Sequence, residues 1–162
     1  MAEKENFDDY RRSVTALGVG NEVMSKENLI KLLRENITEF NNFRQENPKI
    51  LINVPEADLF GANIAGANLE DVILKDANLM NANLNGARLM NTKMKGTIFN
   101  RAKLRGCNIQ NAIFDNMTDF RDADIDVITI QNLMGSNWTE VDKEKWDEYT
   151  LNIIKKEFND SN

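Results

Sequence analysis

The 162-residue chain contains no histidine, one cysteine and only two prolines. Without histidine the commonest general base is missing, and neither a Ser-His nor a Cys-His nucleophile pair can form. The single cysteine excludes a disulfide within the chain and is typical of a reducing compartment, so we expect a cytoplasmic protein. The start Met1–Glu5 has no apolar signal segment, and no apolar run reaches about 18 residues, so we expect no membrane contact. These absences favour a protein that is not an enzyme and needs no cofactor.

The chain has instead a repeat of five residues between positions 57 and 126. An apolar residue stands at every fifth position, with one extra residue before the last two. These 14 central residues are Leu59, Ile64, Leu69, Leu74, Leu79, Leu84, Leu89, Met94, Phe99, Leu104, Ile109, Phe114, Phe120 and Ile125. A small side chain, most often alanine, stands two residues before each of them. At 41% apolar composition, chance would fill all 14 positions with odds on the order of 10⁻⁶, so the repeat is structural.

A period of five fits neither an α-helix nor a flat strand. The central residue and the small residue two before it point to the same side, as on a strand. The other residues must then turn a corner with polar or glycine side chains. Four corners would close a square coil of twenty residues, and stacked coils would pair their backbones at a spacing of roughly 4.8 Å.

Four of the repeats read Ala-(Asp or Asn)-Leu as they stand, at 57–59, 67–69, 77–79 and 82–84. This motif resembles that of the pentapeptide-repeat family, and the resemblance covers residues 57–126. It implies an all-β solenoid core, a right-handed quadrilateral β-helix of about 3.5 coils, with helices at its two ends. The sequence departs from the motif at Val72 and where threonine replaces alanine.

One extra residue interrupts the repeat near Met117. At an offset of 21 residues, Phe99 falls on Phe120. At an offset of 20 residues the inward positions would instead receive Asp119 and Asp122, whose carboxylates would be buried at large cost. We therefore predict that the last coil contains 21 residues.

Helical segments are predicted on both sides of the repeat. We therefore expect one structural domain with three parts: an N-terminal helical cap over 1–56, the repeat over 57–126 and a C-terminal helical segment over 127–162. Apolar residues at helical spacing predict a first helix over 7–17. Ser25 is expected to cap a longer helix that ends before Asn47. We interpret this longer helix as a lid over Leu59 and Ile64 and favour that role over binding of a partner.

The C-terminal segment 127–162 is expected to form two helices. Asp126 should cap a short helix over 127–134 that ends at Gly135. Thr139 should cap a final helix that runs to about Phe158.

The apolar side chains of the final helix spread over roughly 200°, about twice the width that one docking surface needs. Either the helix is buried on two sides within its own chain, or it contacts a second chain. We favour the second alternative and predict a homodimer. The candidate interface residues are Trp146, Tyr149, Ile153, Ile154 and Phe158.

The net charge is −6, but the middle of the repeat is basic, with no acidic residue between Asp76 and Asp115. The six cations of this band are Arg88, Lys93, Lys95, Arg101, Lys103 and Arg105. Four of them would meet a carboxylate one coil later: Arg101 with Asp122, Lys103 with Asp124, Arg105 with Asp126 and Lys95 with Asp115. Such cross-coil pairs favour a structural role over direct binding of nucleic acid.

No metal site is predicted. Asp122, Asp124 and Asp126 resemble the start of a calcium loop, but Val127 stands where that loop requires glycine. Cys107 occupies an inward small-residue position, so we expect a buried, inert thiol.

Two functions remain. The first is a non-enzymatic structural or protein-binding module with an unknown protein partner. Its candidate surface is the strip of Phe60 and Met80, which share one outward column. The second comes from the resemblance, which implies a DNA mimic that binds a type II topoisomerase (DNA gyrase) and protects it from quinolones. Mimicry requires an evenly negative surface, and the basic band between Arg88 and Arg105 argues against it.

Overall fold

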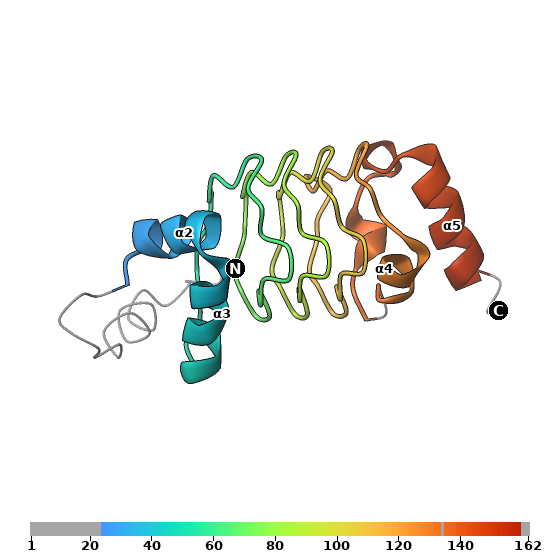
Figure 1. Ribbon diagram of the computed structural model, residues 1–162. Coiled ribbons are helices and arrows are strands. Elements are labelled where there is room, and N and C mark those ends of the chain that lie inside the picture. The colour runs from blue at the N-terminus through green and yellow to red at the C-terminus, as the bar shows by residue number, and fades with distance from the viewer. Residues whose placement is uncertain (1–23, 134, 160–162) are drawn as a thin grey trace, which may run out of the picture.

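The computed structural model describes residues 24–133 and 135–159, which form an elongated tower with helices at its two ends (Figure 1). One end carries α2 (Lys26–Glu35) and α3 (Ile37–Glu46). The other end carries α4 (Val127–Gln131), two 3₁₀ turns, η1 (Trp138–Glu140) and η2 (Lys143–Lys145), and α5 (Glu148–Asn159). Stacked coils fill the space between them, so the solenoid core and its flanking helices are confirmed. The helix predicted over 7–17 lies outside the described residues.

Successive coils are joined by parallel bridges between residues 20 positions apart, such as Asp58 with Asn78 and Asn63 with Asn83. In each bridge the backbone donates and accepts: the Leu59 amide donates to the Asn78 carbonyl, and the Asn78 amide donates to the Ala57 carbonyl, both at 2.9 Å. The faces between corners are so short that each holds a single bridge and no longer strand forms in the part of the chain that the structure describes.

The predicted longer coil is confirmed, because Ile98 bridges Asp119 and Lys103 bridges Asp124, both 21 positions apart. The extra residue sits in a bend that Asp115 closes: its carboxylate accepts the amides of Met117 at 3.1 Å and Thr118 at 3.2 Å. The pairing also begins earlier than the predicted repeat, with a bridge from Asn53 to Ile73.

The interior is a single column of side chains, and the predicted register is confirmed. All 14 central residues are buried, with at most 9% of the surface exposed, at Ile125. The small residues that stand two positions before the central residues are buried too. Where these residues are threonines, their hydroxyls donate hydrogen bonds to backbone carbonyls. Thr92 donates to the Leu69 carbonyl at 2.9 Å and Thr97 to the Leu74 carbonyl at 2.8 Å, so burial of these hydroxyls leaves no unpaired polar group.

The N-terminal helices begin as predicted but do not form one helix. The Ser25 side chain accepts the Asn28 amide at 3.1 Å and so caps α2. The chain then breaks at Asn36, which has an extended φ of −151° and whose side chain accepts the Glu39 amide at 3.0 Å to cap α3. An asparagine side chain can compete in this way with helical backbone bonds. The two helices run in different directions in Figure 1, and both Leu33 and Phe40 reach the core.

Side chains of the N-terminal helices bind backbone groups at the open edge of the first coil, as a lid would. The Asp58 carbonyl has no preceding coil and accepts Nη1 of Arg34 at 2.8 Å. The Asn68 amide donates to Oδ1 of Asn41 at 2.8 Å. The Glu70 carbonyl accepts Nη2 of Arg44 at 2.6 Å. Side chains thus take the place of a missing coil.

At the C-terminal end Asp126 caps α4 as predicted, accepting the Thr129 amide at 2.9 Å, although α4 ends at Gln131. The predicted start of the final helix at Thr139 is wrong, because Thr139 lies in η1. The helix α5 begins at Glu148, and Asp147 accepts the Thr150 amide at 2.8 Å. The segment before it pairs with the last coil, where the Lys145 carbonyl accepts the Phe120 amide at 2.8 Å.

The charge pairs follow the predicted register only in part. Arg101 lies 3.7 Å from Asp122, as predicted. Arg105 instead contacts Asp124 at 3.3 Å, because the Asp126 carboxylate accepts the Gly106 amide and caps α4. The carboxylate of Asp115 likewise accepts the Gly96 amide at 2.8 Å rather than pairing with Lys95. Backbone amides therefore compete with the cations for these carboxylates.

Replacing a central leucine tests the register. Each buried leucine contributes roughly 1.5–3 kcal/mol, and a carboxylate in its place would be buried without a partner. We expect Leu79→Asp to abolish cooperative unfolding in a circular-dichroism melt, because Leu79 is fully buried. The matched control Met117→Asp changes a side chain that is 62% exposed and should melt like the wild type. A cooperative, wild-type melt of Leu79→Asp would show that the register is wrong.

Candidate functional site

One side of the tower carries the exposed apolar strip predicted from the sequence. We call it the Phe60 face and define it by the outward residues of 58–60, 78–80, 98–100 and 119–121. The bridge from Asp58 to Asn78 sets Phe60 beside Met80. The Phe60 side chain is 47% exposed, and Met80 and Ile98 are half-buried. The strip therefore exists, and Ile98 extends it along the face.

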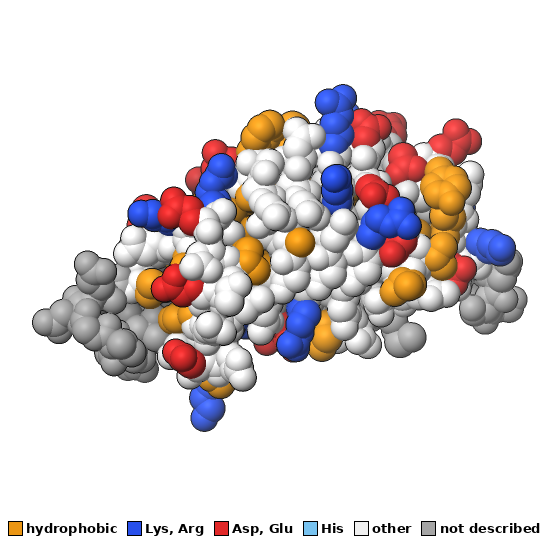
Figure 2. All heavy atoms as spheres, viewed as in Figure 1, with side chains coloured by type: hydrophobic (Ala, Val, Ile, Leu, Met, Phe, Trp, Pro, Cys, Tyr) orange, Lys and Arg blue, Asp and Glu red, His pale blue; other side chains and the backbone are white. Residues whose placement is uncertain are grey.

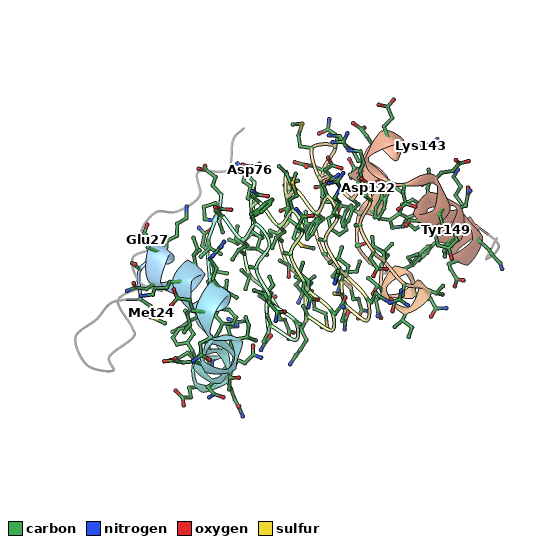
Figure 3. All side chains as sticks on the ribbon, turned by 45° about the horizontal axis from the view of Figure 1, so that its top comes forward. Met24, Glu27, Asp76, Asp122, Lys143 and Tyr149 are labelled. Atoms are coloured by element: carbon green, nitrogen blue, oxygen red, sulfur yellow. The ribbon has the colours of Figure 1, made fainter. Side chains whose placement is uncertain are left out.

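The Phe60 face ends in a hollow of about 520 Å³, which we call the Arg121 hollow. It lies where the segment 144–147 folds back onto the last coil, with the Lys145 carbonyl bound to the Phe120 amide. Figure 3 shows Asp122 at this end of the solenoid, next to the turn that carries Lys143. The hollow is lined by Met80, Ile98, Asn100, Asp119, Arg121, Asp122, Glu144, Trp146 and Asp147.

The ion pair between the buried Asp119 and the exposed Arg121 lines this hollow. The Asp119 carboxylate accepts the Arg121 amide at 3.0 Å and its Nε at 2.9 Å, and it also accepts Nη2. Burial opposes ionisation of Asp119, but the hydrogen bonds from Arg121 outweigh it and lower the pKa of the carboxyl. The sequence analysis did not predict this pair. It could have been found, because the two residues are two positions apart and side chains at that spacing point to the same side of an extended backbone.

The predicted dimer residues divide between the core and the surface. Trp146 is buried and stacks on Phe120, with ring centroids 4.3 Å apart and planes at 5°. It continues the stack of Phe99 on Phe120, whose centroids are 4.8 Å apart, so Trp146 is the last layer of the core. Ile154 is also fully buried within the chain.

The other three predicted interface residues lie at or near the surface of α5. Tyr149 is 72% exposed, and Figure 3 places it on the helix at the end of the molecule. Ile153 is half-buried. The half-buried ring of Phe158 lies 5.8 Å from that of Trp138. A contact with a second chain could use only this part of the predicted surface.

Cys107 is the buried filler that the repeat predicted. Its Sγ lies 3.0 Å from the Leu84 carbonyl, to which the thiol donates. Burial raises the pKa of this thiol to about 12, so it stays protonated and unreactive at neutral pH. Cys107 therefore contributes to packing only.

A second hollow, of about 650 Å³, lies between α3 and the solenoid. Its charges balance: Arg44 and Arg88 face Glu70 and Asp71. Arg88 already forms an ion pair with Glu70, and Arg44 is only 7% exposed and donates to the Ile50 and Glu70 carbonyls. This hollow is explained by attachment of the lid.

Comparison with known proteins identifies the repeat. Residues 57–96 and 91–126 match a family model described as pentapeptide repeats, in eight copies. No curated protein matches the chain.

Several solved structures are also similar, among them pentapeptide repeat proteins. One is a protein (Rfr23) from the cyanobacterium Cyanothece 51142, with 25% identity over 59% of this chain and 60% of that chain and a TM-score of 0.43. QnrB1, a plasmid-mediated fluoroquinolone resistance protein, has 14% identity, covers 66% and 65%, and has a TM-score of 0.26. A protein of the Arabidopsis thaliana thylakoid lumen has 20% identity, covers 56% and 64%, and has a TM-score of 0.22. This chain spans less than two thirds of the length of each.

Among the described residues no helix has the length and apolar character needed to cross a membrane.

Protonation of Asp119 should weaken the fold. Because the pKa of Asp119 is lowered in the folded chain, its stabilisation is present above the unfolded pKa of about 3.9 and is lost as the pH falls through the lower folded value. At neutral pH, Asp119→Asn should lower the free energy of unfolding by about 1–3 kcal/mol. The difference from the wild type should shrink below about pH 4 in urea unfolding curves.

The control is Asp122→Asn, which removes a carboxylate that is 64% exposed and should change stability little. Equal effects of the two variants at neutral pH would contradict a stabilising role for the Asp119–Arg121 pair.

Proposed function

Since residues 57–126 of this chain are pentapeptide repeats, we propose that the protein is a non-enzymatic module that binds a protein partner on its Phe60 face. The observation that supports this most is the exposed Phe60, beside Met80 and in line with the Arg121 hollow. Apolar side chains at fixed positions on a rigid surface suit a protein partner, because little freedom is lost on binding. The proposal includes the right-handed sense of the quadrilateral coil that the resemblance implies and a cytoplasmic location.

Catalysis has no support in the described residues. The chain lacks histidine, and the thiol of Cys107 is buried and protonated. The buried Asp119 is held by Arg121 in an ion pair, which fixes its charge rather than preparing it for proton transfer.

Protein binding also accounts for the surface charge better than DNA mimicry does. A DNA mimic must present carboxylates to a basic groove. The side chains of Arg101, Lys103 and Arg105 are all exposed on one coil. Figure 2 shows cationic and anionic side chains interspersed on the face in view rather than a continuous acidic area. We therefore do not propose a topoisomerase partner.

We propose further that the protein is a homodimer through the surface part of α5, formed by Tyr149, Ile153 and Phe158. Figure 2 shows hydrophobic side chains gathered at the end of the molecule where Figure 1 places α5. An exposed patch of this kind favours association.

Charge introduced on the exposed side of α5 should separate the dimer. We expect sedimentation velocity to give a dimer for the wild type and a monomer for Tyr149→Glu with Ile153→Glu, because a glutamate would be desolvated in the interface. The control Lys143→Glu introduces a glutamate at an exposed residue of η2, outside α5, and should stay dimeric. A monomeric wild type at high concentration would overturn the proposal.

Affinity capture tests the Phe60 face. The immobilised full chain should retain a protein from a bacterial lysate, and Phe60→Glu with Met80→Glu should lose it, since two charges would disrupt an apolar contact. The control Asn63→Glu adds a charge on the neighbouring face, where Asn63 is exposed, and should retain the same protein. Circular-dichroism melts must show that all three proteins are folded. A protein retained equally by all three would contradict binding through the Phe60 face.

A further inference from the structure

We propose that the Arg121 hollow receives a lysine or arginine side chain of the partner, from an extended segment that places an apolar side chain on Phe60 and Met80. The inference rests on the proposed function and names the chemistry of the partner.

The apolar part of the hollow's lining suits the stem of a long cationic side chain. Met80 and Ile98 are half-buried and supply apolar surface beside the polar rim. Lysine and arginine carry apolar stems below a charged head, and such stems pack on apolar surface while the head remains among polar groups.

The charge of the hollow favours a cation. Its lining has four carboxylates, on Asp119, Asp122, Glu144 and Asp147, and one guanidinium, on Arg121. Arg121 is held by Asp119, so an anion would find no free cationic partner there. Lys145 also acts on Asp119 and favours its charged form.

The remaining carboxylates are open to a partner. Asp122 has Arg101 at 3.7 Å, but both side chains are more than half exposed, so a desolvated cation can compete for it. Glu144 is exposed, and no ion-pair partner lies within reach of it in the part of the chain that the structure describes. Asp147 uses its carboxylate to hold Thr150 and adds negative potential.

The distance along the face fits an extended segment. Phe60 lies three coils before Arg121, and coils that pair by backbone hydrogen bonds are spaced by roughly 4.8 Å, so Phe60 and Arg121 lie about 14 Å apart along the face. In an extended peptide the side chains of residues i and i+4 point to one side and lie about 13 Å apart. In a helix the same residues are only about 6 Å apart. We therefore infer the pattern apolar-x-x-x-(Lys or Arg).

The test uses a fluorescein-labelled peptide, Gly-Leu-Ser-Thr-Ser-Arg-Gly, titrated with the full chain and followed by anisotropy. We expect saturable binding below about 1 mM that weakens when salt is raised to about 0.5 M. A peptide with glutamate in place of arginine should not bind, and one with serine in place of leucine should bind more weakly.

Two variants of the protein locate the site. Glu144→Arg reverses an exposed charge at the hollow and should weaken binding of the peptide about tenfold. The control Glu140→Arg makes the same change at an exposed residue of η1 outside the hollow and should change binding less than about twofold.

Three results would overturn the proposal: no binding of the arginine peptide up to about 1 mM, equal binding of the glutamate peptide, or equal affinity of Glu144→Arg and wild type. A failure of this kind can be told apart from failure of the proposed function. If the captured protein is still lost from Phe60→Glu with Met80→Glu, the Phe60 face binds a partner whose chemistry is different.

Discussion

Hydrogen bonds between successive coils are the constraint on which the structure depends. The Leu79 amide donates to the Ile98 carbonyl at 2.9 Å, and the Ile98 amide donates back to the Ala77 carbonyl at 3.0 Å. This exchange requires each residue to lie over the residue one coil earlier. A side chain therefore points inward or outward in the same way in every coil. The column of central side chains, the aromatic stack from Phe99 to Trp146 and the outward strip of Phe60 and Met80 all follow from it.

The same constraint leaves an unpaired edge at each end, and the flanking segments satisfy both edges by different means. At the N-terminal end the partners are side chains of helices, from Arg34, Asn41 and Arg44. At the C-terminal end the chain supplies hydrogen-bond partners in the place of a further coil. The Lys145 carbonyl binds the Phe120 amide, and the Asn137 side chain binds the amide and the carbonyl of Phe114. These bonds reduce the number of backbone groups at each end that are free to pair with another strand.

The sequence predicted the register and the longer last coil, because burial in a repeat depends on spacing alone. It did not predict features that depend on how segments meet. The break at Asn36 reflects competition between a side chain and the helix, and the contact of Arg105 with Asp124 reflects the use of Asp126 by backbone amides. The burial of Trp146 and Asp119 depends on where 144–147 folds back, and no periodic pattern records that. The exposed strip was predictable, while the hollow beside it was not.

The architecture also limits where and how strongly a partner can bind. The lid attaches through Asn41 and Arg44 to the Gly66 and Glu70 carbonyls and through Arg34 to the Asp58 carbonyl, at the first-coil edge of the Phe60 face. Phe60 itself remains 47% exposed beside this contact. A strip of a few half-exposed side chains offers far less area than a stable protein interface, so one copy should bind weakly. A rigid face lowers the entropic cost of that contact, and two linked copies would raise the apparent affinity through effective concentration. Dimerisation through α5 would therefore strengthen partner binding without any new contact on the Phe60 face.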